Sequence, residues 1–386
     1  MSIVSPGART VPLHRRSLFA APLLAPALAR AQDFETVPSR RGAFRFRVFA
    51  SGLENPWGGG FLPDGRLLVT ERPGRVRLVS PEGQVSAPLA GLPEVEDSGQ
   101  GGLLDIQPAP DFAATSEVFF SAATRVQGGA LTRLYRARLR GDRLTQVLAV
   151  VDAAPAQARG RNHFGGRIAF SPDGAHLFLT CGDRYNERGR AQQMDDLAGK
   201  ILRLTRDGRI PRDNPFAGRP GHRGEIWTYG HRNPQGIAFH PATGSLFAAE
   251  FGPLGGDELN LLRPGEQYGW PEVSYGREYS GRPIANGRTS GPGITEPVKY
   301  WAPAVSPSGL AFAPPDAQPI WRGSLFMACL NTPGLLRMEM DGDRVSSEER
   351  LLWGRARMRH VIFAPDGALL LLTDEPRGRI LRLEAA

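Results

Sequence analysis

Several short polar segments lie between the hydrophobic runs of this chain, and their side chains are of types that could do chemistry. They occupy residues 99–103, 162–167, 182–183, 230–236, 250–253, 257–258, 268–270 and 357–359. Histidine is suited to proton transfer because its ordinary pKa of about 6.5 lies close to neutral pH. The planar fork of arginine binds carboxylate oxygens through paired hydrogen bonds. The segments therefore combine a candidate base, His163, with candidate anion-binding groups such as Arg232.

Arg357 and Arg359 are two residues apart, so on a strand both side chains face the same side. They form a candidate paired site for carboxylates. Without further context, a solvated strand face is the alternative for the two arginines. An ordinary structural histidine is the alternative for His163.

The elements that must position these segments repeat along the chain. Six copies of one pattern occur, in which one or two apolar residues precede a proline-containing turn and a hydrophobic strand. The copies begin at Phe61, Ile106, Phe170, Phe239, Phe312 and Phe363. Asp-Gly and Pro-Asp-Gly are tight-turn signals because glycine adopts positive φ without steric cost. Each copy therefore predicts the centre of a β-hairpin.

Six hairpins with neighbouring strands predict an all-β fold, a six-bladed β-propeller of four-stranded antiparallel blades, formed as one domain by residues 32–386. The 47 glycines and 34 prolines fit a chain with many turns. Radial closure protects the sheet edges of so long a β chain. A tandem of β-sandwiches is the alternative, but it gives no reason for six similar copies. Ligands of propellers usually sit at the mouth of the central channel, where we expect the polar segments to meet.

The N-terminus has the features of an export signal. Arg15 and Arg16 precede Ser-Leu-Phe and an apolar run over residues 20–28, and Ala29 and Ala31 are small residues at the positions that a signal peptidase reads. This order predicts a twin-arginine signal at residues 1–31 and a periplasmic or secreted protein. A disordered basic tail is the alternative. The apolar run is too short and too rich in proline to span a bilayer, so we expect no stable membrane insertion.

The charge distribution and the absence of nucleotide-binding motifs argue against nucleic-acid and nucleotide partners. The net charge is +8, but residues 1–31 contain four of the 47 basic residues and none of the 39 acidic ones, so the remainder carries +4. The arginines are spread along the chain rather than gathered in a patch, which argues against a nucleic-acid partner. No GxGxxG or GxxxxGK[ST] nucleotide motif occurs.

Cys181 and Cys329 are the only cysteines, too few for a zinc site. Both lie in apolar strand-like runs. Buried free thiols and a single disulfide both remain open.

Taken in order, these segments form a specific set. Its most specific element is GHRNPQG at 230–236, followed by E-x-G-P at 250–253, D-E-x-N at 257–260 and YGWP at 268–271. The set resembles the soluble quinoprotein glucose/sorbosone dehydrogenase family, in particular its bacterial aldose sugar dehydrogenases. The similarity extends from about residue 44 to 383. It implies an enzyme that uses pyrroloquinoline quinone (PQQ) and Ca²⁺ to oxidise the C1 hydroxyl of soluble aldose sugars to lactones. The sugar, the electron acceptor and the oligomeric state stay undetermined.

The resemblance also implies catalytic roles for three residues. His163 matches the general base that takes the proton of the anomeric hydroxyl, and Asp183 matches the carboxylate that orients this base. Arg232 matches a cofactor contact that stabilises the reduced quinone.

Further positions match cofactor and metal contacts of the family. The implied cofactor contacts are Gln100, His163, Arg232, Asn233, Tyr279, Arg357 and Arg359. The backbone carbonyls of Gly252 and Pro253 match ligands of a calcium ion beside the cofactor, where hard oxygen donors are suited to that ion. Glu258 and the carbonyl of Tyr268 resemble a second calcium site. A surface loop carboxylate is the alternative for Glu258.

Three positions depart from the family pattern. Asn331 replaces a lysine, His360 follows R-x-R in place of aspartate, and Ala304 stands where some members have a hydroxyl. We expect these changes to weaken cofactor binding more than they affect the fold. Two other functions stay open, a calcium-dependent propeller lactonase and a non-catalytic propeller that binds a partner. The lactonase would not need Arg232, Arg357 and Arg359 at one site.

Overall fold

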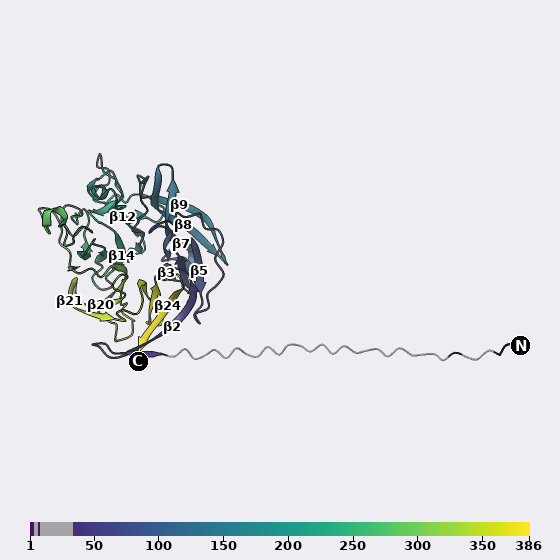
Figure 1. Cartoon of the computed structure of the whole chain (residues 1–386). Helices are drawn as coiled ribbons and strands as arrows, with labels where there is room; N and C mark the ends of the chain where they lie inside the picture. The colour runs from purple at the N-terminus through teal and green to yellow at the C-terminus, as the bar shows by residue number, and fades with distance from the viewer. Residues whose placement is uncertain (4–6, 8–33) are drawn as a thin grey trace. The chain divides into compact units, whose positions relative to one another are not determined.

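Six antiparallel β-sheets follow one another along the chain in the computed structural model and form a ring (Figure 1). The structure describes residues 1–3, 7 and 34–386. Phe34–Ala386 form one unit, and most of the predicted export signal at residues 1–31 lies outside the described residues. The first strands of successive sheets contact one another, β3 with β6, then β10, β14, β18, β22 and again β3. The ring is therefore closed, and the predicted six-bladed β-propeller is confirmed.

In each blade the first strand lies at the central channel, and the other strands follow outwards in hydrogen-bonded order. Blade 1 contains β3 (Pro56–Phe61), β4 (Leu67–Glu71) and β5 (Arg75–Val79). Blade 2 contains β6 (Leu103–Pro108), β7 (Glu117–Val126), β8 (Gly129–Arg140) and β9 (Arg143–Asp152). Blade 3 contains β10 (Ile168–Phe170), β11 (His176–Cys181), β12 (Lys200–Thr205) and β13 (Ile226–Tyr229).

The other three blades complete the ring. Blade 4 contains β14 (Pro234–Phe239), β15 (Leu246–Glu250), β16 (Asp257–Leu262) and β17 (Lys299–Trp301). Blade 5 contains β18 (Pro307–Phe312), β19 (Ser324–Cys329), β20 (Gly334–Asp341) and β21 (Arg344–Leu351). Blade 6 contains β22 (Met358–Phe363), β23 (Leu369–Thr373), β24 (Gly378–Ala385), β2 (Phe44–Leu53) and β1 (Glu35–Val37). Helical turns are limited to α1 (Phe112–Thr115) and the 3₁₀ segments η1 (Arg188–Gln192) and η2 (Ile284–Gly287) among the described residues.

Blades 1 and 6 do not have the predicted four strands: blade 1 has three regular strands and blade 6 has five. Blade 6 is completed by β2 from the N-terminal side, with Val48 opposite Leu381 on β24, and β1 adds a fifth strand. Blade 1 has three regular strands, and residues 85–89 run beside β5 through a bridge between Val79 and Val85. Pairing of the two ends of the domain closes the ring without an additional blade.

The six repeated turns of the sequence all lie between the first and second strands of their blades. Gly65 and Gly174, for example, have φ values of +84° and +70°, and each donates its N–H to the carbonyl of the residue three positions earlier. These hairpin turns lie at one rim of the ring. The segments before each first strand and after each second strand therefore lie at the opposite rim, where most of the polar segments are found.

Hydrophobic side chains fill the spaces between neighbouring blades. Phe119 of β7, for example, packs with Leu177 of β11 and Leu202 of β12, all three fully buried. Cys181 and Cys329 are buried free thiols, so the disulfide alternative is excluded. Burial raises the pKa of the Cys181 thiol to about 12, which makes it unreactive.

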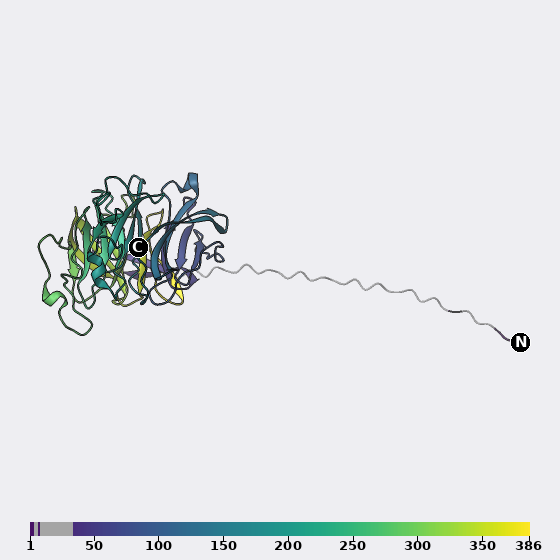
Figure 2. The same ribbon diagram turned by 90° about the horizontal axis from the view of Figure 1, so that it is seen from above.

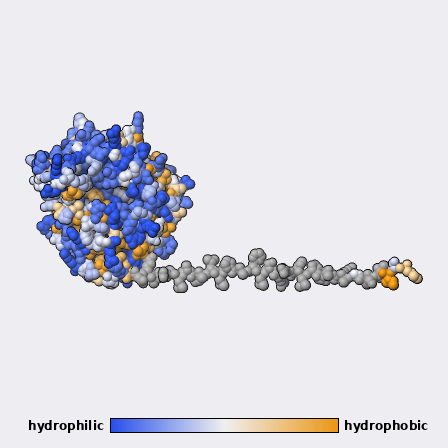
Figure 3. Space-filling model, in the orientation of Figure 1, coloured by the Kyte–Doolittle hydropathy of each residue, from blue (hydrophilic) through white to orange (hydrophobic). Residues whose placement is uncertain are grey.

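The outside of the propeller is mostly hydrophilic on the face that Figure 3 shows, with hydrophobic residues in small groups. No helix among the described residues is long and apolar enough to cross a membrane. The long connection between β16 and β17, residues 263–298, projects from the sheets in both ribbon views (Figure 1, Figure 2). This connection supplies part of the site described next.

Candidate active site

A cavity of about 340 Å³ lies at the rim where the polar segments meet. This volume is within the range of about 300–1,000 Å³ that small-molecule sites occupy. All predicted cofactor contacts and the two predicted carbonyl ligands line it, namely Gln100, His163, Arg232, Asn233, Gly252, Pro253, Tyr279, Arg357 and Arg359. Residues that are up to 259 positions apart in the chain are thus brought together by closure of the ring.

The predicted base and its carboxylate form a buried pair. His163 Nδ1 lies 2.7 Å from Asp183 Oδ1. The same carboxylate accepts hydrogen bonds from Tyr185 N and from Trp270 Nε1, both at 2.7 Å. The backbone of His163 has a φ of +53° and donates its N–H to Gln100 Oε1 at 2.9 Å. A left-handed backbone is uncommon for a non-glycine residue, so the surrounding contacts must hold the histidine in this orientation.

The electrostatic surroundings keep the His163 imidazole neutral. Burial lowers the pKa of His163 most, the hydrogen bond that His163 donates to Asp183 raises it, and the positive charges of Arg232 and Arg184 lower it further. Burial would raise the pKa of Asp183, but His163 and Arg232 hold it below its ordinary value. A neutral imidazole that donates Nδ1–H to an ionised Asp183 presents the lone pair of Nε2, as a general base requires.

Arg232 and Asn233 precede β14 and are held from both sides. Arg232 N donates to Glu250 Oε2 at 2.7 Å, and its guanidinium Nη1 donates to the Gly252 carbonyl at 3.0 Å. Asn233 Oδ1 accepts the N–H of Gly165 at 3.2 Å, which ties the arginine segment to the His163 segment.

The two arginines of blade 6 share one carboxylate. Arg357 Nη2 and Arg359 Nη2 each lie 2.9 Å from Asp374 Oδ2. Although burial opposes it, the two guanidinium groups lower the pKa of Asp374 to about 2. Asn331, at the position of the family lysine, accepts a hydrogen bond from Arg357 Nη1 at 2.7 Å. The asparagine therefore orients an arginine in the cavity wall.

The donor set of the cavity fits an anionic ligand with several carboxylates. Arg72 lines the cavity together with Arg232, Arg357 and Arg359, against the single carboxylate of Asp374. In addition, the buried Nε of Arg359 has no hydrogen-bond partner within the described structure. An excess of guanidinium groups with unused donors is the environment that carboxylates of a ligand would satisfy.

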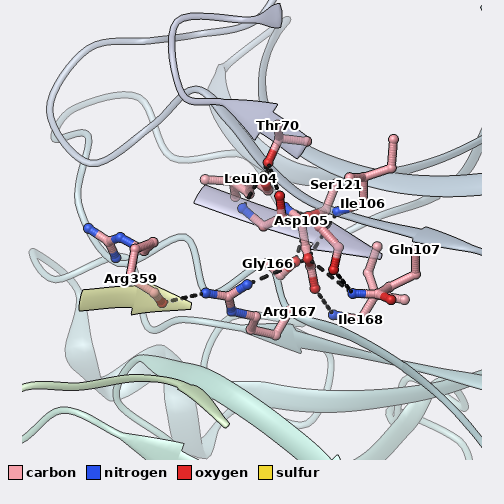
Figure 4. Close-up of polar contacts among 12 residues, drawn as sticks. Thr70, Leu104, Asp105, Ile106, Gln107, Ser121, Gly166, Arg167, Ile168 and Arg359 are labelled. Atoms are coloured by element: carbon pink, nitrogen blue, oxygen red, sulfur yellow. Dashed lines mark hydrogen bonds and ion pairs between the residues drawn. The ribbon is translucent and has the colours of Figure 1, made fainter. Parts of the chain in front are cut away.

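A buried polar network around Arg167 and Asp105 adjoins the cavity, and Figure 4 shows its contacts. Arg167, only 2% exposed, donates to the carbonyls of Gln235 at 2.7 Å and Arg359 at 3.0 Å. Its guanidinium lies 4.0 Å from the ring centroid of Trp57 and 3.5 Å from Asp105 Oδ1. The network thus connects five blades next to the cavity and positions Arg359.

Two of the three departures from the family pattern lie away from the cavity. His360 is buried next to Gly309 and, like Ala304, is not among the residues that line the cavity. Of the three departures, Asn331 is therefore the one that lies in the cavity wall, where it could affect cofactor binding directly.

The predicted metal ligands lie close to the site. The Gly252 carbonyl already accepts the Arg232 guanidinium, so a cation there would share or displace this contact. Glu258 and Tyr268 line a small space of about 10 Å³ together with Glu250, enough for one ion or water. Burial and the charge of Glu250 raise the pKa of Glu258. A cation bound beside the carboxylate would lower this pKa again. No cluster of three or more His, Cys, Asp or Glu side chains able to hold a metal occurs among the described residues.

A second cavity of about 360 Å³ adjoins the first and shares His163, Arg232, Pro253 and Tyr279 with it. Its walls are formed by Tyr185, Arg188, Trp270 and Glu278, and Arg188 pairs with Glu278 at 2.5 Å. Aromatic faces next to paired charges offer both apolar and hydrogen-bonding contacts to a polyhydroxylated molecule.

Sequence reasoning assigned no role to Arg72, Asp374, Gln235 or Trp270. Trp270 lay in a recognised segment, YGWP, but nothing in the sequence related its indole to Asp183. Arg72 and Asp374 follow β4 and β23, and the position after the second strand is the only signal that could have identified them.

A family model described as Glucose / Sorbosone dehydrogenase matches residues 53–382. The chain belongs to this family. It is 40% identical over 378 residues to the aldose sugar dehydrogenase YliI of Escherichia coli, with 96% of this chain and 99% of that protein covered. The crystal structure of the soluble E. coli aldose sugar dehydrogenase in its apo form superposes with a TM-score of 0.85, covering 89% of this chain and 100% of that chain at 40% identity.

A further similar structure is that of the PQQ-bound form of the aldose sugar dehydrogenase from Streptomyces coelicolor. It has a TM-score of 0.75 and 32% identity, and the comparison covers 90% of this chain and 100% of that chain. The predicted family, fold and oxidoreductase class are confirmed at this level.

Proposed function

We propose that this protein is a PQQ- and calcium-dependent dehydrogenase that oxidises the C1 hydroxyl of soluble aldose sugars to lactones. The observation that carries the proposal is the convergence of a neutral, carboxylate-held His163 and the guanidinium groups of Arg232, Arg357 and Arg359 on one cavity. The PQQ-bound structure of a family member that is 32% identical supports the same assignment.

The cofactor would be held in the 340 Å³ cavity. Arg72, Arg357 and Arg359 would bind its carboxylates, and Arg232 and Asn233 would bind its quinone oxygens. When bound, PQQ supplies the two-electron acceptor that takes the hydride from C1 of the sugar. The buried guanidinium of Arg232 would favour the added negative charge, because charge pairs are strong in a partly desolvated site.

His163 would act as the general base. Its Nε2 accepts the proton of the C1 hydroxyl while Asp183 retains the hydrogen bond from Nδ1–H. The ionised Asp183 then stabilises the imidazolium that forms, since it lies 2.7 Å away. The sugar would occupy the second cavity, which reaches His163 from the side of the 263–298 connection.

Calcium would be held by the Gly252 and Pro253 carbonyls beside the cofactor, and a second ion by Glu258 and the Tyr268 carbonyl. An ion at the first position would act as a Lewis acid toward the cofactor. Removal of Ca²⁺ with a chelator should therefore abolish activity, and calcium should restore it. Full activity after exhaustive chelation would contradict both metal assignments.

Reconstitution tests the proposed function. Residues 32–386 would be purified without cofactor, supplied with PQQ and Ca²⁺, and assayed by dye reduction with glucose and other aldoses. Dye reduction that requires both additions is the expected result. Absence of PQQ binding by fluorescence titration would contradict the proposal and favour the partner-binding propeller. Lactone hydrolysis without dye reduction would favour the lactonase.

We also propose export through a twin-arginine signal at residues 1–31, which leads to a periplasmic or secreted enzyme. Replacement of Arg15 and Arg16 by lysine should leave the protein in the cytoplasmic fraction. Unchanged export of the double variant would exclude this route.

A further inference from the structure

Asp183 is held through both of its carboxylate oxygens. Oδ1 accepts His163 Nδ1 and Tyr185 N, and Oδ2 accepts the indole Nε1 of Trp270, all at 2.7 Å. The Tyr185 amide comes from a neighbouring position in the chain, whereas Trp270 comes from the 263–298 connection. Apart from His163 itself, Trp270 is therefore the side chain that holds this carboxylate from outside its own segment.

The indole is itself fixed in place. Trp270 is 8% exposed and packs with Ala191 and Ile284. Its backbone N–H donates to the Gly230 carbonyl at 2.9 Å, and its carbonyl accepts Gln192 Nε2 at 2.7 Å. Because the backbone is anchored on both sides and the ring is packed, the N–H has little freedom to leave Asp183.

The chemistry of indole makes this contact directional. An indole N–H can only donate, whereas a hydroxyl or an amide could also accept. The Oδ2 atom opposite Trp270 must therefore present a lone pair, and because Tyr185 N donates to Oδ1, the contacts on both oxygens favour the ionised form of Asp183. An acceptor-only carboxylate requires His163 Nδ1 to carry the proton, and this leaves the Nε2 lone pair toward the cavities.

We propose that Trp270 is a positioning residue that fixes the orientation of Asp183 and thereby the tautomer and direction of His163. Its catalytic consequence rests on the proposed function, but its structural consequence does not. Trp270 also forms a wall of the second cavity, so the same side chain connects the substrate side of the site with the base.

A Trp270→Phe variant tests the inference because it keeps an aromatic wall and removes the N–H. Trp301→Phe is a matched control, since Trp301 is also buried and donates its Nε1 to a carboxylate, Glu348 Oε2, at 3.0 Å. We expect kcat of Trp270→Phe to fall about 10- to 100-fold with KM nearly unchanged. The control should keep both constants.

The second readout is NMR titration of the His163 imidazole in the cofactor-free chain. The charged groups that face it are Asp183, Arg232 and Arg184. Loss of the indole donor concentrates the negative charge of Asp183 on His163, so we expect the pKa of His163 to rise in Trp270→Phe and to stay in place in Trp301→Phe. An isosteric benzothienylalanine at position 270, which lacks the N–H but fills the volume, should reproduce the shift.

Two outcomes would overturn the inference. An unchanged His163 titration in Trp270→Phe would show that the indole does not fix the pair. A change in KM with unchanged kcat would show that Trp270 contributes only to the wall of the second cavity and not to the orientation of His163. If the reconstituted enzyme oxidises no sugar, the proposed function fails, while the titration of the cofactor-free chain still decides the positioning role.

Discussion

Two histidine–carboxylate pairs of nearly equal length lie in this propeller, and they differ in what surrounds the second ring nitrogen. His163 lies 2.7 Å from Asp183, is 4% exposed and lines both cavities. His231 lies 2.8 Å from Glu250 and is fully buried. His231 Nε2 also bonds to Thr228 Oγ1 at 2.9 Å, and its ring stacks on Tyr268.

The comparison separates a reactive pair from a structural one. Both ring nitrogens of His231 are engaged within the protein, so no proton can be exchanged with a ligand there. Glu250 uses its other oxygen to accept Arg232 N at 2.7 Å, so this pair holds the backbone of the cofactor segment. His163 has its Nδ1 engaged in the same manner, but its Nε2 is left for the substrate.

The largest effect should come from removal of the reactive imidazole. His163→Ala should lower turnover by about 10²- to 10⁴-fold, typical for loss of a positioned base, while PQQ still binds. Stopped-flow dye reduction and a quinone titration measure the two quantities. Near-wild-type turnover would remove His163 from the mechanism.

The next effect concerns the residue that the structural pair supports. Arg232→Ala should weaken PQQ binding by about 10- to 100-fold, because a charge-assisted hydrogen bond and a cavity-facing cation are lost. Fluorescence titration of the cofactor-free protein measures the affinity relative to the parent chain. An affinity equal to that of the parent would contradict the role of Arg232.

A smaller effect on activity is expected at the structural pair. His231→Phe keeps a ring against Tyr268 but leaves Thr228 and Glu250 without their partner, so the free energy of unfolding should fall by about 1–3 kcal/mol. Turnover of the folded variant should stay within about tenfold of the parent. Denaturant titration and dye reduction provide the measurements, and a loss as large as that of His163→Ala would erase the distinction between the pairs.

The pH dependence sharpens the assignment of the base. The neutral form of His163 is the active one, so activity is present above its folded-state pKa and is lost as the pH falls through it. Since burial and two arginines lower this pKa, the acid limb of kcat/KM should lie below pH 6.5. A limb above pH 6.5 would indicate a different titrating group.

Much of the architecture was predictable because its signals are local. Each Pro-Asp-Gly copy specifies a turn through the backbone preference of a few residues, and six copies suffice to indicate six hairpins. The strand number of blades 1 and 6 was not predictable in this way. In blade 6 it depends on pairing of β2 with β24, over 300 positions away, which no local pattern encodes, and in blade 1 the segment beside β5 pairs only through an isolated bridge.

The candidate site likewise combines features that local sequence predicts with features that depend on long-range contacts. The sequence alone was enough to assign the family through ordered segments such as GHRNPQG, and to name His163, Asp183 and three of the four cavity arginines, with Arg72 the one it missed. It could not show that His231 is bonded within the protein through both ring nitrogens whereas His163 is bonded through Nδ1, nor relate Trp270 to Asp183, because both facts depend on contacts between distant loops. Those contacts exist only after ring closure brings the ends of different blades to one rim, since burial and hydrogen-bond partners are properties of the packed structure.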